Sequence, residues 1–196
     1  RFFSAGTRTN NALSSILLSF PALPRFKSIL NDDQVEQSFS SLATLLKKRN
    51  YETSLLYAGD INDDNIYTFF STQGYDNVLG EEFLSDTVFS TSYGVADEYL
   101  YNAAKGIIRD SKTPYLLTLL NISNHQPYEY PKHAGTKHIY RNSQLNKKQQ
   151  SFVYADWALG QFMNWYKGQP DYEKTIYIIV GDHGYFHGTE NKDLSL

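Results

Sequence analysis

Thr175-Ile176-Tyr177-Ile178-Ile179-Val180-Gly181-Asp182-His183-Gly184, a stretch near the end of the chain, decides the fold class. Its first six residues are apolar or β-branched, and they predict a strand buried on both faces, as strands of parallel sheets are. Open parallel sheets bind ligands and metals in the crevice outside the carboxyl ends of their strands. We therefore expect Asp182 and His183, which follow the strand, to lie where the chemistry takes place.

The rest of the chain alternates between apolar strands and amphipathic helices. This alternation predicts an α/β fold with a mostly parallel sheet flanked by helices. Further strands are expected over residues 52–58 and 115–120. Helices are expected over residues 12–18, 32–49, 65–72, 96–109 and 144–167, and a long loop over 128–142. The 196 residues fit a single domain or part of one.

Composition excludes several classes of function. The net charge of −3, with 20% charged residues, provides no basic field for nucleic acid. The absence of cysteine excludes a disulfide framework, a thiolate zinc site and a cysteine nucleophile, but it leaves the cellular compartment open. The apolar run Ile16-Leu17-Leu18 is followed by Ser19 and Pro21, so it is far shorter than the ~20 residues that span a bilayer.

Asp182 and His183 are the first candidate site residues. A carboxylate beside an imidazole can ligate a divalent transition metal such as Mn²⁺ or Zn²⁺. Two adjacent ligands leave the coordination shell incomplete, so other segments would have to contribute. An aspartate that caps a turn beside a surface histidine explains the pair equally well from these two residues alone.

Thr9 and His125 are further candidates. A hydroxyl at a helix N-terminus lies where an anion is favoured, so a phosphate could dock at Thr9, although most such threonines only cap a helix. His125 follows the strand over 115–120, and it would reach the same sheet edge as Asp182. There it could bind a phosphoryl oxygen or assist a leaving group; the alternative is a loop histidine with a satisfied hydrogen bond. His133 and His138 are interpreted as surface residues.

Several motifs occur in a fixed order along nearly the whole chain. They are Gly6-Thr7-Arg8-Thr9, Tyr57-Ala58-Gly59-Asp60, Asn65-Ile66-Tyr67, Gly74-Tyr75, Ser123-Asn124-His125-Gln126-Pro127, Tyr154-Ala155-Asp156-Trp157-Ala158-Leu159-Gly160 and Gly181-Asp182-His183-Gly184. This ordered set resembles the lipoteichoic acid synthase and phosphoglycerol transferase family of the sulfatase and alkaline phosphatase superfamily. Each motif is weak alone, whereas their order is fairly specific.

The resemblance implies a role for each candidate. Thr9 would be both nucleophile and metal ligand, and Asp182 and His183 would bind the divalent cation, which is most often Mn²⁺, with Zn²⁺ and Mg²⁺ as alternatives. Arg8, His125 and His187 would bind the substrate, with His125 also catalytic. Thr9 would attack the phosphodiester of phosphatidylglycerol or a related phospholipid headgroup, expel diacylglycerol, and pass glycerophosphate to a hydroxyl of a glycan or polymer.

The resemblance also implies a location. Residues 1–196 would form a sulfatase-like catalytic domain at the extracytoplasmic face of a bacterial membrane, tethered by transmembrane helices outside this chain. We expect one more metal-binding glutamate to precede Arg1, so the domain is expected to be truncated and its own turnover is in question. Two alternatives stay open: a phosphodiesterase or sulfatase of the same superfamily, and a non-catalytic binding or regulatory domain. Sulfate esters are disfavoured because no cysteine is present as a formylglycine precursor.

Overall fold

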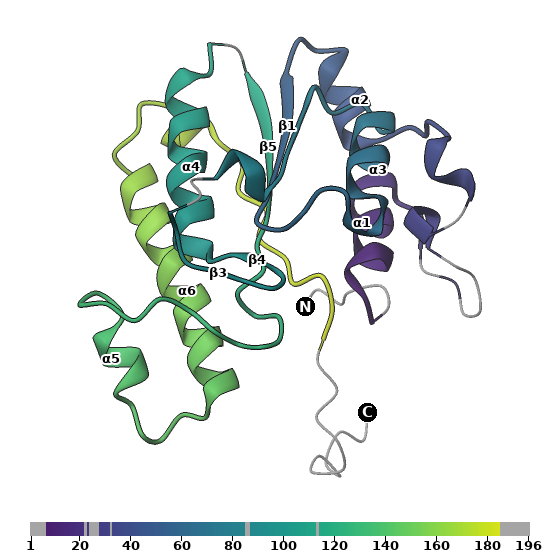
Figure 1. Cartoon of the computed structure of the whole chain (residues 1–196). Helices are drawn as coiled ribbons and strands as arrows, with labels where there is room; N and C mark the ends of the chain where they lie inside the picture. The colour runs from purple at the N-terminus through teal and green to yellow at the C-terminus, as the bar shows by residue number, and fades with distance from the viewer. Residues whose placement is uncertain are drawn as a thin grey trace, which may run out of the picture.

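A three-stranded parallel sheet forms the centre of the molecule (Figure 1). The structure is a computed structural model, and it describes residues 7–21, 23, 28–31, 33–84, 87–112 and 114–184. The strand order is β2-β1-β5, with β1 at Glu52–Tyr57, β2 at Asn77–Leu79 and β5 at Tyr115–Leu120. β1 pairs with β5 from Glu52↔Tyr115 to Tyr57↔Leu120. The predicted α/β class with a parallel sheet is confirmed.

Helices cover both faces of this sheet (Figure 1). One face carries α1 (Thr9–Leu18), α2 (Leu42–Lys47) and α3 (Ile66–Thr72). The other face carries α4 (Asp97–Asp110) and α6 (Lys147–Tyr166). Successive side chains of a strand point to opposite faces, so Leu55 packs in the first layer and Leu56 in the second, and neither is exposed to solvent. β1 is therefore buried on both sides.

Local sequence accounts for the longer helices. In α4, Leu100, Ala104 and Ile108 recur at the four-residue spacing of one helix face, and all three are buried. α6 begins with a capping box in which the Asn146 side chain accepts from the Gln149 N–H and the Gln149 side chain accepts from the Asn146 N–H. The helices predicted over 65–72, 96–109 and 144–167 are confirmed within three residues at each end.

The helix predicted over residues 32–49 is wrong as a single element. The structure has a 3₁₀ turn at Asp33–Glu36 and then α2 from Leu42. Ser41 separates the two because its backbone is extended and its side chain accepts from the Thr44 N–H, while Thr44 Oγ1 accepts from the Ser41 N–H. A capping box starts a new helix at this point.

Several small elements were not expected, among them the strand β2, a short helix and a hairpin. The loop over 128–142 contains the four-residue helix α5 (Lys137–Tyr140), and a hairpin is formed by β3 (Ser90–Thr91) and β4 (Gly94–Val95). The hairpin is attached to the end of β1, since the Val95 N–H donates to the Ala58 carbonyl at 2.7 Å. Gly94 has φ +138, and a Cβ there would lie 2.2 Å from the Ala58 oxygen, so this approach requires glycine.

The strand predicted over residues 175–180 does not form in the structure. The segment has no strand assignment, and Ile176, Ile178 and Ile179 are 87%, 70% and 66% exposed. It runs in the direction of β1 and β5 toward their carboxyl ends (Figure 1). Among the described residues, however, no backbone–backbone hydrogen bond involves residues 176–184. An apolar run specifies a strand only where a neighbouring strand pairs with it. None of the described helices is both long and apolar enough to cross a membrane.

Candidate functional site

Thr9 and Asp182 meet at the carboxyl edge of the sheet. The Thr9 hydroxyl Oγ1 donates to Asp182 Oδ2 at 2.6 Å, although the two residues lie 173 positions apart in the sequence. α1 presents Thr9 from its first turn, and the segment after Thr175 brings Asp182 to the same edge (Figure 1). The structure thus joins the two halves of the site that the sequence proposed, while their chemical roles stay predictions.

Thr9 is not the cap of α1. The N-cap position is Arg8, whose side chain forms no capping hydrogen bond, and Thr9 is the first residue with helical geometry. Its hydroxyl donates to a carboxylate, and hydrogen bonds to ionised acceptors are about twice as strong as those between neutral groups. The Thr9 hydroxyl therefore points out of the helix toward the site.

Asp182 and His183 are arranged so that several donor atoms converge. The His183 N–H donates to Asp182 Oδ1 at 2.9 Å, and His183 Nε2 lies 3.6 Å from Asp182 Oδ2. His183 Nδ1 is 2.9 Å from the carbonyl oxygen of Gly184. A carbonyl can only accept, so Nδ1 carries the hydrogen and Nε2 of the neutral ring holds the lone pair. Asp182 Oδ2 thus has the Thr9 oxygen and the His183 nitrogen beside it.

This donor set fits a divalent cation in part. One hydroxyl, one carboxylate and one imidazole nitrogen are ligand types that Mn²⁺ and Zn²⁺ accept. Carbonyl bonding of Nδ1 is the usual means of orienting a metal-binding histidine. The part of the chain that the structure describes holds no group of three or more His, Asp or Glu side chains that could bind a metal. A complete shell would need at least one more protein ligand or solvent.

His125 follows β5 as predicted, but no hydrogen bond between described residues joins it to the Thr9–Asp182 pair. Its Nδ1 is 2.9 Å from the Gln126 carbonyl oxygen, so the neutral ring carries its hydrogen on Nδ1 and leaves Nε2 open. Its ring lies 4.2 Å, between centroids, from the ring of Tyr93 at the tip of the β3–β4 hairpin. Among the described residues, His125 has no hydrogen bond to Thr9, Asp182 or His183.

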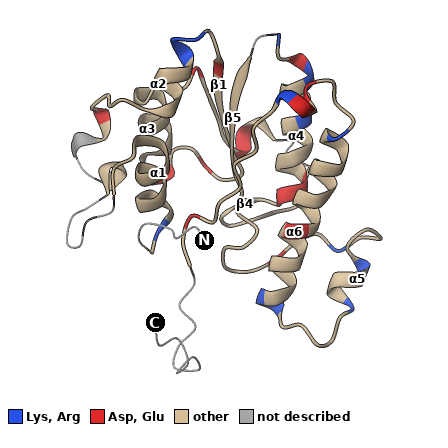
Figure 2. Cartoon of the chain, turned by 180° about the vertical axis from the view of Figure 1, so that it is seen from behind, with Lys and Arg blue, Asp and Glu red and all other residues tan. Residues whose placement is uncertain are grey.

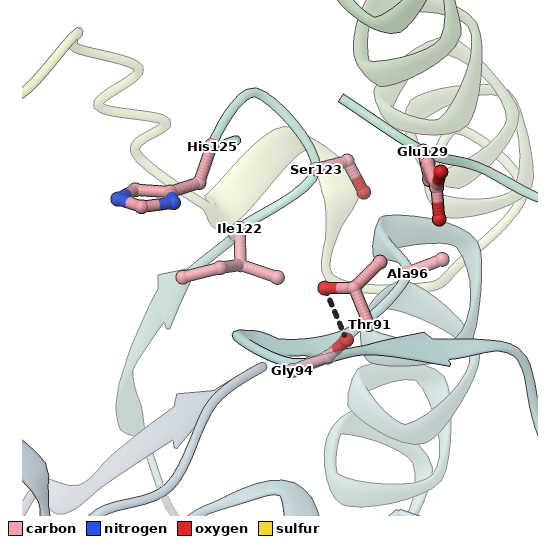
Figure 3. A pocket seen from close by; sticks show the side chains of 7 residues that line it. All are labelled: Thr91, Gly94, Ala96, Ile122, Ser123, His125 and Glu129. Carbon is pink, nitrogen blue, oxygen red and sulfur yellow. Dashed lines mark hydrogen bonds between the residues drawn. The ribbon is translucent and has the colours of Figure 1, made fainter. Parts of the chain in front are cut away.

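A small pocket lies beside His125 (Figure 3). Its lining comes from the hairpin, from the start of α4 and from the turns after β5, and consists of Thr91, Gly94, Ala96, Ile122, Ser123, His125 and Glu129. In Figure 3 the imidazole of His125 points away from Ser123 and Glu129. His125 is exposed to solvent, and the ring of Tyr93 lies against its imidazole.

The remaining predicted residues are less informative. Arg8 is exposed and adjacent to Thr9, as a substrate-binding cation would have to be. Among the described residues its side chain forms no ion pair. His187 lies outside the described residues. His133, interpreted as a surface residue, is exposed but pairs through Nε2 with Glu98 Oε1 at 3.0 Å.

The end of β1 is strongly acidic, as the red segments of Figure 2 show in part. Burial raises the pKa of Tyr57 to about 12, and the neighbouring carboxylates of Asp63, Asp64, Glu81 and Asp60 add to the shift. Burial, together with the charges of Asp60, Glu82 and Asp63, also raises the pKa of Glu81. The carboxylates at this part of the edge repel anionic groups.

Sequence reasoning assigned no role to three residues that shape the site: Tyr93, Asp97 and Ser123. Tyr93 lies at the tip of a hairpin with two residues per strand, which is too short to show a period. Asp97 and Ser123 bind each other from α4 and from the turn after β5. Acidic residues at helix starts are common, so Asp97 carried no distinctive signal.

Comparison with known proteins identifies the family of this chain. The sulfatase family model matches residues 1–195. Lipoteichoic acid synthase 2 of Bacillus subtilis (strain 168) is 22% identical over 171 residues, which cover 83% of this chain and 26% of that protein. A crystal structure from Vibrio parahaemolyticus, described as a protein in the alkaline phosphatase superfamily, matches with TM-score 0.75 and 31% identity over 86% of this chain and 41% of that one. The lipoteichoic acid synthase LtaP of Listeria monocytogenes matches with TM-score 0.72 and 22% identity, over 85% of this chain and 42% of that one.

These matches confirm the resemblance that the motif order predicted, and the solved neighbours share the α/β fold. The chain spans 26% and 30% of the length of the first two curated relatives, and less than half of each solved chain.

Proposed function

Since this chain belongs to the sulfatase family, we propose that it forms part of the catalytic domain of a metal-dependent phosphoglycerol-type transferase. The observation that carries the proposal is the 2.6 Å hydrogen bond from Thr9 Oγ1 to Asp182 Oδ2. It brings a hydroxyl nucleophile to a carboxylate at the carboxyl edge of a parallel sheet, where such folds bind their substrates. The curated relatives named lipoteichoic acid synthases support the same reaction class.

Thr9 Oγ1 is the nucleophile in this proposal. It forms a bond to the phosphorus of a phospholipid headgroup phosphodiester, and the bond from phosphorus to the lipid alcohol breaks. The Thr9 proton already points at Asp182 Oδ2, which can accept it. Nε2 of His125, whose lone pair is open, can take up a proton from solvent and deliver it to the departing alcohol oxygen. An acceptor hydroxyl of a glycan or polymer then displaces Thr9 from phosphorus and takes the glycerophosphate.

Thr9, Asp182 and the Nε2 atom of His183 would hold the cation, for which Mn²⁺ is the first candidate and Zn²⁺ and Mg²⁺ are alternatives. When bound, it supplies Lewis-acid chemistry, lowering the pKa of the Thr9 hydroxyl and neutralising phosphate charge. The carbonyl of Gly184 fixes the His183 ring in the tautomer that this binding needs. Arg8 is placed to pair with a phosphate oxygen, and His187 would join it from the segment after Gly184.

The substrates and the location come from the same family reasoning. A phospholipid headgroup would be the donor, and the domain would act at the extracytoplasmic face of a bacterial membrane, carried by transmembrane helices elsewhere in the protein. We take residues 1–196 as one part of that domain, because they cover about 26% of the Bacillus subtilis relative.

A Thr9→Ala variant of the full-length protein tests this function. With Mn²⁺ and a fluorescent phosphatidylglycerol, we expect diacylglycerol release to fall at least about 100-fold, because no other hydroxyl of the described residues donates to Asp182. Thr72→Ala, at the end of α3, is the matched control and should keep wild-type activity. Running the assay with and without a polyol acceptor separates transfer from hydrolysis. Undiminished release by Thr9→Ala would refute the assignment of the nucleophile.

A further inference from the structure

Asp97, the first residue of α4, is a fully buried carboxylate at 0% exposure, and none of the steps above uses it. We infer that Asp97 is the positioning residue for His125, because it fixes the turn over residues 121–123 that carries the imidazole to the sheet edge.

Four hydrogen bonds link Asp97 to this turn. Its Oδ1 accepts from the N–H groups of Ile122 at 3.1 Å and Ser123 at 2.9 Å. Its Oδ2 accepts from the Asn121 side-chain amide at 2.7 Å. In return, the Asp97 N–H donates to Ser123 Oγ at 3.0 Å. The reciprocal pattern is that of a capping box, but it joins a helix to a turn 26 residues away.

The carboxylate of Asp97 opposes any movement of the turn away from α4. A buried carboxylate is costly unless hydrogen bonds compensate it. Among the described residues no Lys or Arg side chain pairs with Asp97. Compensation comes from the three donors of the turn and from the N-terminal end of the α4 dipole. If the turn moved, the carboxylate would lose all three donors while staying buried.

The same turn fixes His125. The His125 N–H donates to the Ile122 carbonyl at 2.8 Å, so Asp97 holds the N–H of Ile122 while the C=O of the same residue holds His125. Pairing of β5 with β1 ends just before this point, where the Ala58 N–H donates to the Leu120 carbonyl at 3.0 Å. After β5, the backbone N–H groups of residues 122 and 123 thus donate to the Asp97 carboxylate instead of to a neighbouring strand. The ring of Tyr93 then contacts the His125 ring from the hairpin.

A purely structural alternative exists, in which Asp97 only stabilises the start of α4. The two roles differ in what happens at His125. The catalytic consequence rests on the proposed function, whereas the position of the ring does not.

Asp97→Asn in the full-length protein is the central variant, because it keeps the shape and removes one acceptor. We expect amide hydrogen exchange at Ile122, Ser123 and His125 to accelerate at least about tenfold. We also expect the NMR signals of the His125 ring to lose the ring-current shift from Tyr93. kcat should fall about tenfold because the proton carrier is displaced, and KM should rise by a smaller factor, because His125 also binds substrate while Arg8 stays in place.

Three further variants make the test specific. In the double variant Asp97→Asn with Asn121→Asp, the amide introduced at position 97 can donate to the new carboxylate at position 121, so slow exchange and the His125 signals should largely return. Asp110→Asn, at the exposed end of the same helix, is the control and should match the wild type in every readout. If Asp97→Asn does not fold, Asn121→Ala removes one of the three donors from the exposed side and should give a smaller change of the same kind.

Unchanged exchange and unchanged His125 signals in Asp97→Asn would overturn the inference. So would a loosened turn with a wild-type kcat, since Asp97 would then be structural alone. If the wild-type protein shows no transfer at all, the proposed function fails, and the exchange and ring signals still decide whether Asp97 positions His125.

Discussion

Two segments of this molecule have nearly the same sequence pattern but differ in structure. Residues 115–120 and 175–180 are both six-residue apolar runs, and a candidate histidine follows each of them. The first run pairs with β1 at all six positions. The second has no strand pairing among the described residues and exposes three isoleucines. An apolar run therefore states a tendency to pair, and the available partner decides the outcome.

The same contrast holds for the two parts of the site. After β5, Asp97 fixes the turn that carries His125 through four hydrogen bonds. The second segment is fixed at its start, where Thr175 Oγ1 donates to the Asp171 carbonyl and contacts the Tyr166 hydroxyl, each at 2.9 Å. At its far end, the Thr9–Asp182 bond is the one hydrogen bond between described residues that joins residues 178–184 to another part of the chain. The part of the site around His125 is thus preorganised. The position of Asp182 depends on its hydrogen bond to Thr9 and on any ligand that binds there.

Truncating one leucine and one isoleucine would measure this difference. Leu119→Ala in β5 should lower the free energy of unfolding by about 2 kcal/mol, because Leu119 packs against the core between the sheet and helices α4 and α6. Ile178→Ala, at 70% exposure, should cost less than about 0.5 kcal/mol. Urea unfolding of the two variants provides the values. Equal losses would show that residues 175–180 are packed in solution, and the strand prediction would then be restored.

Alkaline pH should have a smaller effect on the free energy of unfolding, through Tyr57 at the end of β1. Burial raises the pKa of Tyr57 from 10.0 to about 12, so the folded state holds this proton more tightly than the unfolded chain does. Its contribution to stability is complete below pH 10 and is lost as the pH rises toward 12. Tyr57→Phe should therefore remove about 1 kcal/mol of the pH dependence over this interval, after allowance for solvent screening. Tyr67→Phe, on the exposed side of α3, is the control. An identical pH profile for wild type and Tyr57→Phe would contradict the buried position of this hydroxyl.

The elements that could be predicted from the sequence are those long enough to show a periodic pattern of apolar residues. β1, β5, α3, α4 and α6 are long enough to show it, and the structure confirms them. β2 and the β3–β4 hairpin have two or three residues per strand and show no period. The break at Ser41 was visible in principle, since Ser41 and Thr44 form a capping-box pattern that the apolar spacing obscured.

The site divides in the same way. The ordered motifs predicted that Thr9 and Asp182 belong together, and the hydrogen bond between them agrees. The role of Asp97 could not be predicted, because its partners lie 24 to 26 residues away and come close only through packing of α4 against the sheet. Long-range hydrogen bonds of this kind leave no periodic signal in a sequence.

Metal titration tests the central claim, that Thr9, Asp182 and His183 form one cation site. Isothermal titration of Mn²⁺ into the full-length protein should show binding at micromolar concentration. Asp182→Ala should weaken the binding about 100-fold and Thr9→Ala about tenfold, because each removes a ligand atom. Asp156→Ala, at an exposed position on α6, should leave the binding unchanged. Wild-type affinity in Asp182→Ala, or no binding by the intact protein, would contradict the account.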